Sequence, residues 1–156
     1  MNAAYLESIV LIERLHRLFL DVLKAEIERM GIRDINNVQC FLLYNIGKEE
    51  LSIGELTQRG YYLGSNVTYN LKKMIECGYV LQERSKRDRR SSYIKLTEKG
   101  LAMCAKLQQI LDEQVECLVR RGESKEGFVA ATKMLHSLET FWGTLLSTSG
   151  RNSLAS

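Results

Sequence analysis

The sequence predicts a mostly helical α+β fold. Apolar residues recur at helical spacing over six segments, two short β-rich runs stand close together, and glycines rather than prolines separate the segments. The chain has 156 residues, 45% of them hydrophobic, and no proline. This length and composition suit one domain with one core, which we expect to span residues 1–146.

Two helices are predicted in the first third of the chain. Apolar residues repeat at helical spacing over residues 4–30, and Gly31 is suited to end that helix. A second helix is expected over residues 37–46, with Gly47 after its last turn. The side chains that this second helix would bury are Val38, Phe41 and Leu42.

Two shorter helices follow, each with a starting signal. Ser52 and Glu55 form a capping box, in which the serine oxygen accepts an amide proton and the glutamate reaches back. This box predicts a short helix directly after it. Ser65 is expected to cap a further helix over residues 66–77, with Gly78 in the position just past the helix end.

The β-rich runs 79–82 and 91–96 predict a hairpin whose loop is charged. Residues 84–90 read RSKRDRR, which gives five basic residues, one acidic residue and a net charge of +4. The rest of the chain holds 17 basic and 18 acidic residues. The whole positive excess of the chain is therefore concentrated in the hairpin loop.

Two long helices are predicted after the hairpin. Thr97 can cap a helix that ends at Gly122, and the segment 124–126 opens a last helix. Both helices carry an apolar stripe at helical spacing. Residues 147–156, STSGRNSLAS, are small and polar, and they predict a disordered tail.

Two short helices followed by a basic hairpin are typical of a winged helix-turn-helix, whose second helix lies in the major groove of DNA. One arc of helix 66–77 is apolar and is expected to face the core; it consists of Val67, Leu71, Met74 and Ile75. The opposite arc carries hydroxyl, amide and cationic groups, which suit base edges and phosphates. The predicted DNA contacts of this helix are Ser65, Asn66, Thr68, Tyr69, Lys72 and Lys73.

The basic loop is predicted to act as the wing. One aspartate cannot pair with five cations, so most of the cations are left for phosphates or a neighbouring groove. Asp88 is expected to have a structural role, in which it holds one arginine of the wing in place. The predicted DNA contacts of the wing are Arg84, Lys86, Arg87, Arg89 and Arg90.

Three motifs lie in the predicted core: GYV at 78–80, DRR at 88–90 and LTEKG at 96–100. With these motifs, residues 51–100 resemble the DNA-binding core of the MarR family of transcriptional regulators. The segment 59–74 is similar to a subgroup of alphaproteobacterial regulators of stress and envelope genes. The family often has a proline in the wing or before the turn, and this chain has none. The resemblance implies a sequence-specific regulator that binds double-stranded DNA.

The helices at the two ends of the chain carry more apolar surface than a domain of this size can obviously cover. We expect residues 36–100 to form the winged helix-turn-helix core, and residues 1–31 and 98–146 to be dimerisation helices. The resemblance implies a homodimer on a pseudo-palindromic operator, with recognition helices about 34 Å apart. A monomeric bundle of the end helices is the alternative.

The resemblance also implies release from DNA by a small aromatic or phenolic effector, or by thiol oxidation. The effector would change the spacing between the two recognition helices. The candidate lining residues, at the junction of the dimer helices with the DNA-binding lobe, are His16, Phe19, Leu20, Phe41, Tyr44 and Cys104. The alternative is that the apolar members belong to the core and that the thiol is inert.

Other classes of function have little support. The sequence lacks a phosphate-binding glycine loop and a serine-hydrolase motif, so no enzyme is predicted. Four cysteines without metal-ligand spacing and only two histidines predict no metal or cofactor. The absence of an export or membrane segment favours the cytoplasm. The competing interpretation is a winged-helix adaptor that binds proteins and not DNA, which would have an apolar outer face on helix 66–77.

Overall fold

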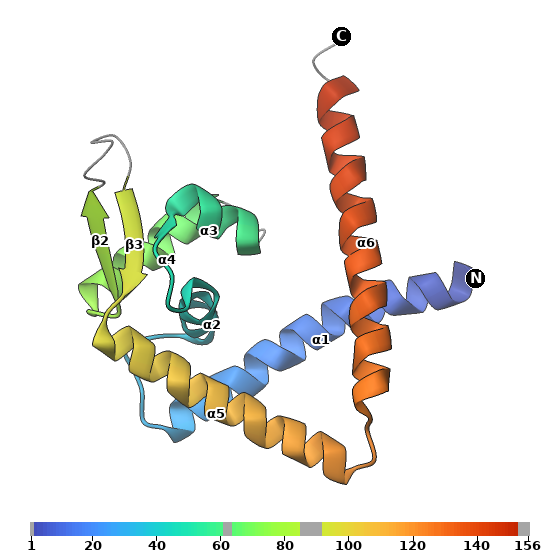
Figure 1. Cartoon of the computed structure of the whole chain (residues 1–156), viewed down its shortest axis with the longest axis horizontal. Helices are drawn as coiled ribbons and strands as arrows, with labels where there is room; N and C mark the ends of the chain where they lie inside the picture. The colour runs from blue at the N-terminus through green and yellow to red at the C-terminus, as the bar shows by residue number, and fades with distance from the viewer. Residues whose placement is uncertain (1, 61–63, 85–91, 153–156) are drawn as a thin grey trace. The chain divides into compact units, whose positions relative to one another are not determined.

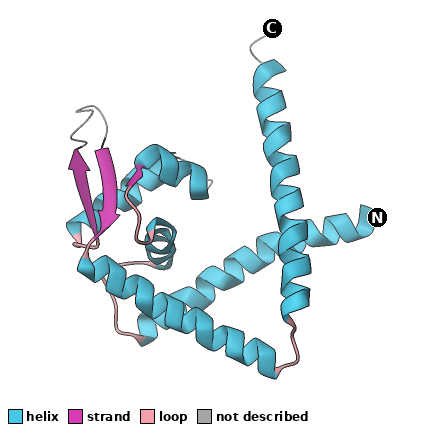
Figure 2. Cartoon of the chain, viewed as in Figure 1, coloured by secondary structure: helices cyan, strands magenta, loops and turns pink. Residues whose placement is uncertain are grey.

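The computed structural model describes residues 2–60, 64–84 and 92–152. These residues form six α-helices and a small three-stranded sheet (Figure 1). Figure 2 shows how little of the chain is strand, which confirms the mostly helical α+β class. The chain divides into two compact units, Met1–Leu111 and Asp112–Ser156, and the division falls inside one helix.

The first unit holds the hydrophobic core and most of the elements. Its helices are α1 (Asn2–Arg29), α2 (Asn37–Ile46), α3 (Ile53–Gly60), α4 (Gly64–Glu76) and the first part of α5 (Glu98–Arg120). The helix α2 lies in the middle of the core and packs against α1, α3 and α4. Its side chains Leu42, Leu43 and Ile46 are at most 1% exposed. The core therefore holds α3 and α4 against α2 in a helix-turn-helix.

The sheet consists of β1 (Leu51–Ser52), β2 (Val80–Arg84) and β3 (Ser92–Leu96), in the order β1-β3-β2. The strands β2 and β3 form the predicted hairpin, with Val80 opposite Leu96. The strand β1 was not predicted from the sequence; it pairs with β3 through Leu51 and Ile94. Two residues are too few for an alternating pattern, so only the pairing with β3 defines this strand.

The capping box of Ser52 and Glu55 and the glycine after α4 are confirmed. The amide of Ser52 donates to Glu55 Oε2 at 2.7 Å, and the amide of Glu55 donates to Ser52 Oγ at 3.2 Å. Helix α4 ends in a Schellman motif, in which the amide of Tyr79 donates to the carbonyl of Met74 at 2.9 Å. Gly78 has a φ of +76° in that motif, which explains a glycine at this position.

One predicted cap and one predicted boundary differ from the structure. Helix α4 begins at Gly64, so Ser65 lies within the helix. A capping residue would instead lie just before the helix and have a non-helical backbone. The second unit holds the rest of α5 and helix α6 (Lys125–Asn152), which continues past residue 146, where the disordered tail was expected. Hydroxyls of Thr140, Thr144 and Ser147 donate to carbonyls three or four residues earlier, so these small polar residues remain compatible with a helix. Residues 153–156 of the predicted tail lie outside the described residues.

None of the helices in the described ranges is both long and apolar enough to cross a membrane.

Candidate nucleic-acid interface

Helix α4 presents an apolar face to the core and a polar face to solvent. Val67, Leu71 and Met74 are at most 3% exposed, and Ile75 packs against the same core. These are the residues that the sequence analysis placed on the inner arc. The opposite face exposes Asn66, Thr68, Tyr69, Lys72 and Lys73. The side chain of Ser65 lies outside the described residues.

The exposed face of α4 has the composition expected for contact with nucleic acid. Tyr69 is 63% exposed and is the one large apolar side chain among these residues. Lys73 Nζ lies 3.3 Å from Glu76 Oε2, so part of its charge is balanced within the helix. Lys72 has no ion-pair partner among the residues that the structure describes. This mixed polar and cationic face does not match the apolar face that a protein-binding adaptor requires.

The wing is described only up to its two ends. Arg84 is exposed at the end of β2, opposite Ser92 of β3. The remaining predicted wing residues Lys86, Arg87, Asp88, Arg89 and Arg90 lie outside the described residues. Lys95 of β3 bonds Glu83 Oε1 at 2.8 Å, and this hydrogen bond is the main reason why the pKa of Lys95 is raised. The charge of Lys95 is therefore balanced within the sheet by the carboxylate of Glu83.

Three of the predicted effector residues form one aromatic group. The ring centroids of Phe19 and Phe41 are 5.2 Å apart in an edge-on arrangement, and those of Phe41 and Tyr44 are 6.1 Å apart and stacked. Tyr44 Oη donates to Gln108 Oε1 of α5 at 3.0 Å. Gln108 was not predicted as a partner, because no sequence signal links it to a tyrosine 64 residues away.

The other predicted effector residues are not joined to this group by a described interaction. Leu20 is half-buried, and its carbonyl oxygen accepts a hydrogen bond from Asn37 Nδ2 at 2.8 Å. Cys104 is half-buried and packs against the core. His16 is exposed on α1, and within the described ranges it has neither a hydrogen bond nor a ring contact. Among the predicted effector residues, the described ring contacts therefore join Phe19, Phe41 and Tyr44 but not His16.

The four cysteines are free thiols, and the pKa values of Cys40 and Cys104 are raised. Burial, with a smaller contribution from Cys104, raises the pKa of Cys40 to about 12. Burial also raises the pKa of Cys104 to about 11. Because the thiolate is the form that attacks an oxidant, these raised pKa values leave little of either thiol in its nucleophilic form at neutral pH. Cys117 is exposed, and Arg120 Nη2 donates to its sulfur at 3.0 Å.

Within the described ranges, no three histidine, cysteine or acidic side chains are grouped so that they could hold a metal ion.

The chain is similar in sequence to known DNA-binding proteins. Residues 35–100 match the model of a winged helix DNA-binding domain. The chain is 39% identical over 139 residues to the exopolysaccharide II synthesis transcriptional activator ExpG of Rhizobium meliloti. That match covers 89% of this chain and 72% of ExpG.

Solved structures share the fold over most of the chain. FabT of Streptococcus pneumoniae, in complex with DNA, has a TM-score of 0.73 and 22% identity, and the match covers 90% of this chain and 99% of FabT. AbsC of Streptomyces coelicolor, a MarR family transcriptional regulator, has a TM-score of 0.72 and 17% identity, with 92% and 94% covered. A mutant of MarR from E. coli, complexed with operator DNA, has a TM-score of 0.68 and 19% identity, with 82% and 90% covered.

Proposed function

Because the chain belongs to the MarR family of winged helix-turn-helix transcriptional regulators, we propose that it binds a pseudo-palindromic operator as a homodimer. The broader function follows from the family itself: the chain is a DNA-binding transcriptional regulator and not an enzyme. One observation carries the proposed contact with DNA. Helix α4 buries its apolar side and exposes Tyr69 and Lys72 on the other, as a helix that enters the major groove requires.

The residues of α4 and the wing have distinct roles in this proposal. Ser65, Asn66, Thr68 and Tyr69 read or position the bases, because their hydroxyl and amide groups suit base edges. The cations of Lys72 and Lys73 hold phosphates, and Lys73 shares its charge with Glu76. The wing cations Arg84, Lys86, Arg87, Arg89 and Arg90 contact the flanking groove and backbone, and Asp88 holds the wing.

The exposed apolar side chains of three helices support a homodimer. Helix α1 exposes Leu6, Val10, Leu15, Leu18 and Val22 by 46–58%. In the second unit, α5 exposes Val115 and Val119 by 57% and 63%, and α6 exposes Phe128, Leu135, Phe141 and Leu145 by 50–53%. Apolar stripes of this extent are costly in water and are typical of subunit interfaces. A second copy of the chain would cover them.

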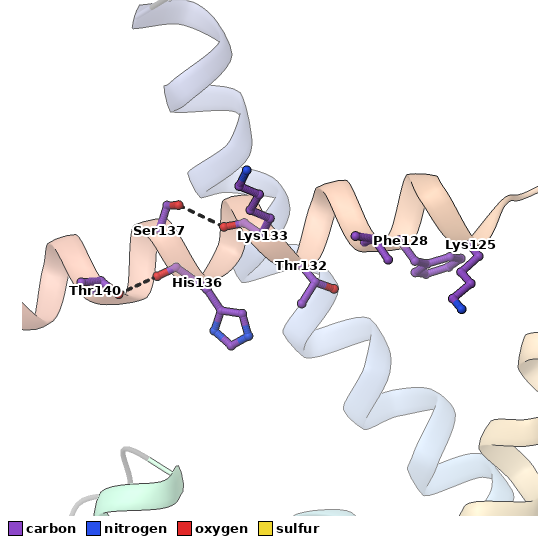
Figure 3. Close-up of a pocket in the computed structure, with 8 residues that line it drawn as sticks. Lys125, Phe128, Thr132, Lys133, His136, Ser137 and Thr140 are labelled. Atoms are coloured by element: carbon purple, nitrogen blue, oxygen red, sulfur yellow. Dashed lines mark hydrogen bonds between the residues drawn. The ribbon is translucent and has the colours of Figure 1, made fainter.

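One side of α6 is hollowed along its first half. The hollow is lined by residues of this single helix, among them Phe128, Thr132 and His136 (Figure 3). A hollow whose described lining comes from a single helix is a surface and not an enclosed site for a small molecule. It supports the proposal that a helix of a partner subunit packs there.

We assign the effector response to the aromatic group of Phe19, Phe41 and Tyr44. The edge-on and stacked rings offer apolar faces, and the tyrosine hydroxyl with Gln108 offers a polar end. This combination suits a small aromatic or phenolic molecule. The raised pKa values of Cys40 and Cys104 argue against these two thiols as the sensors of an oxidant.

Selection of random double-stranded DNA by the full chain, at two salt concentrations, tests the proposed function. We expect a pseudo-palindrome whose half-sites are about one helical turn apart. Enrichment of a single, unpaired half-site would contradict the homodimer. A complete lack of DNA binding at low salt would contradict the proposal as a whole.

Two substitutions on α4 should separate phosphate contact from base contact. Lys72→Ala is expected to weaken binding to all sequences and to reduce the slope of log K against log salt by about 1, because one phosphate contact is lost. Asn66→Ala is expected to relax the sequence preference at one position of each half-site, with the salt slope unchanged. Affinities over a salt series, on the selected operator and on a scrambled duplex, measure both effects.

Lys106→Ala is the control for these variants, because it removes one exposed cation from α5 without changing α4. Equal salt slopes for Lys72→Ala and the wild type would show that this lysine does not touch phosphate. An unchanged sequence preference of Asn66→Ala would place the reading face elsewhere on the helix.

A further inference from the structure

Two hydrogen-bonded contacts connect helix α4 to one short stretch of the chain, residues 34–39, between α1 and α2. We call this stretch the connector; it ends in the first turn of α2. Asn37 Nδ2 donates to the carbonyl of Leu20 at 2.8 Å, which ties the connector to α1. The connector therefore lies between α1 and α4 in the first unit.

The first contact joins the connector to the middle of α4. Gln39 is 7% exposed and is the buried polar residue of the described core. Its Oε1 accepts the amide of Asn36 at 3.1 Å, and its Nε2 donates to Asn70 Oδ1 at 3.2 Å. Asn70 Nδ2 in turn donates to the carbonyl of Asn66 at 2.9 Å. The contact thus reaches the turn of α4 that carries Asn66 and Tyr69 on its outer face.

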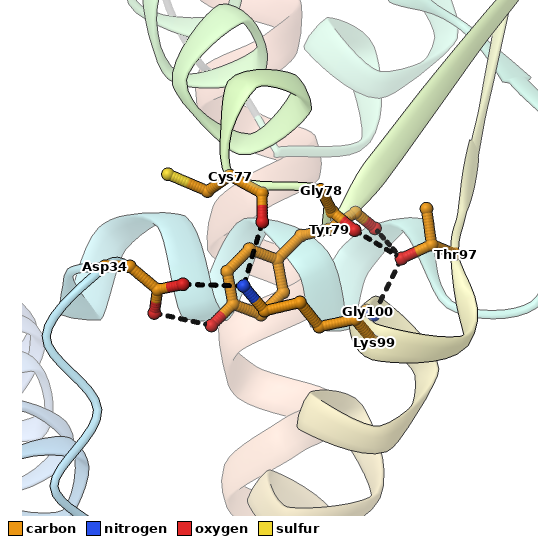
Figure 4. Close-up of polar contacts among 7 residues, drawn as sticks. All are labelled: Asp34, Cys77, Gly78, Tyr79, Thr97, Lys99 and Gly100. Carbon is orange, nitrogen blue, oxygen red and sulfur yellow. Dashed lines mark hydrogen bonds and ion pairs between the residues drawn. The ribbon is translucent and has the colours of Figure 1, made fainter.

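The second contact joins the connector to the end of α4 and to the start of α5 (Figure 4). Asp34 accepts the Tyr79 hydroxyl at 2.8 Å on one carboxylate oxygen and Lys99 Nζ at 2.6 Å on the other. Lys99 Nζ also donates to the carbonyl of Cys77 at 2.8 Å, and it lies 4.1 Å from the centre of the Tyr79 ring. One lysine at the head of α5 therefore holds both the connector and Cys77, the residue that directly follows α4.

The protonation states of Asp34 and Tyr79 allow the hydrogen bonds of this second contact to persist at neutral pH. The hydrogen bond from Lys99 is the largest cause that lowers the pKa of Asp34, so its carboxylate is ionised at neutral pH. Burial, followed by the hydrogen bond to Asp34, raises the pKa of Tyr79. The hydroxyl of Tyr79 therefore stays protonated and remains a donor.

We propose that Asp34, Gln39 and Lys99 are positioning residues for DNA recognition, which fix α4 relative to α1 and the head of α5. They do not touch DNA in this proposal. They hold the recognition helix at two points, so that the angle of α4 to α1 and to the head of α5 is fixed. The distance between the two recognition helices of a dimer is then fixed as well. The inference rests on the proposed function, because a preferred half-site distance exists only for a dimer on two half-sites.

The decisive variant is Asp34→Asn, because charge and positioning predict opposite results. The substitution removes a negative charge, so electrostatics alone predicts tighter binding to all DNA. Loss of positioning predicts about tenfold weaker binding to the selected operator, a loss of the size that one mismatched base pair causes, with affinity for scrambled DNA unchanged or slightly higher. Lys99→Met should weaken operator binding by a similar factor, and the double variant should be no worse than Lys99→Met.

Lys106→Met is the matched control for Lys99→Met, since both remove one cation from α5. Gln39→Met tests the first contact with a side chain of similar length. Each variant is titrated against the operator, against scrambled DNA, and against operators with one to three base pairs inserted between the half-sites. Thermal unfolding of each variant is measured in parallel.

The proposal expects Asp34→Asn, Lys99→Met and Gln39→Met to lose affinity for the operator and to discriminate less between the half-site spacings. The control should retain both properties. Tighter or unchanged operator binding by Asp34→Asn would overturn the proposal. An equal loss on operator and scrambled DNA, together with a lower melting temperature, would also overturn it, because that result indicates a role in folding alone. If the wild type itself had no preferred operator, the proposed function would fail first.

Discussion

Gly100→Ala is expected to destabilise the folded chain by about 3 kcal/mol, an effect typical of severe overpacking. A Cβ atom on Gly100 would lie 2.3 Å from the carbonyl oxygen of Tyr79 and 3.2 Å from Leu96 Cβ. The clashing oxygen belongs to the backbone and cannot rotate away. It also accepts the amide of Thr97 at 3.0 Å, so α5 and the turn after α4 would have to separate. The loss is measured by urea unfolding.

Gly54→Ala is the matched control. Gly54 also lies in the first turn of a helix, but a Cβ atom there would come no closer than 3.9 Å to Ser52 Oγ. Because alanine is the better helix former, this variant should be as stable as the wild type or slightly more stable. If Gly100→Ala unfolded at the same urea concentration as Gly54→Ala, the close approach of α5 to Tyr79 would not exist in solution.

Leu135→Glu is expected to convert the homodimer to a monomer and to abolish high-affinity operator binding. Leu135 is 50% exposed in the middle of the apolar stripe of α6. In the proposed dimer this substitution would bury one unpaired carboxylate per subunit, which should raise the dimer dissociation constant by roughly a hundredfold or more. A monomer contacts only one half-site and so loses the gain from the linked second contact. Analytical ultracentrifugation and operator titrations measure the two losses.

Ser147→Glu controls for charge and for helix propensity. It adds the same charge to the same helix, and Ser147 is exposed, does not line the hollow of α6 and has its hydroxyl bonded to the carbonyl of Thr144 at 2.9 Å. We expect this variant to remain dimeric and to bind the operator. A Leu135→Glu protein that still sedimented as a dimer would show that this stripe of α6 is not the interface.

The sequence predicted the elements whose signals are local. The capping box of Ser52 and Glu55, the left-handed Gly78 and the inner arc of α4 each depend on residues within one or two turns of each other. Such patterns are visible in the chain because helix geometry repeats every few residues. The inner and outer faces of α4 were therefore predicted correctly from Asn66 onward, and the structure buries and exposes the same side chains there.

The links between distant residues were invisible in the sequence. Asp34, Tyr79 and Lys99 form one polar group across 65 residues, and Gln39 meets Asn70 across 31 residues. The strand β1 was missed for the same reason, because two residues have no period and only β3 defines them. In each case the partner lies in a separate element, and no spacing rule connects the two positions.

The sequence by itself determined the class of fold, the order of the helices and the hairpin, the polar face of α4 and the positive charge of the wing. Each follows from periodicity, capping or composition, which are properties of neighbouring residues. The tertiary structure alone decided how α4 is held, through the connector and the head of α5, and why residue 100 is a glycine. The physical reason is that burial and hydrogen bonding join whichever groups the folded chain brings together, and this choice is made by the packing of the whole core.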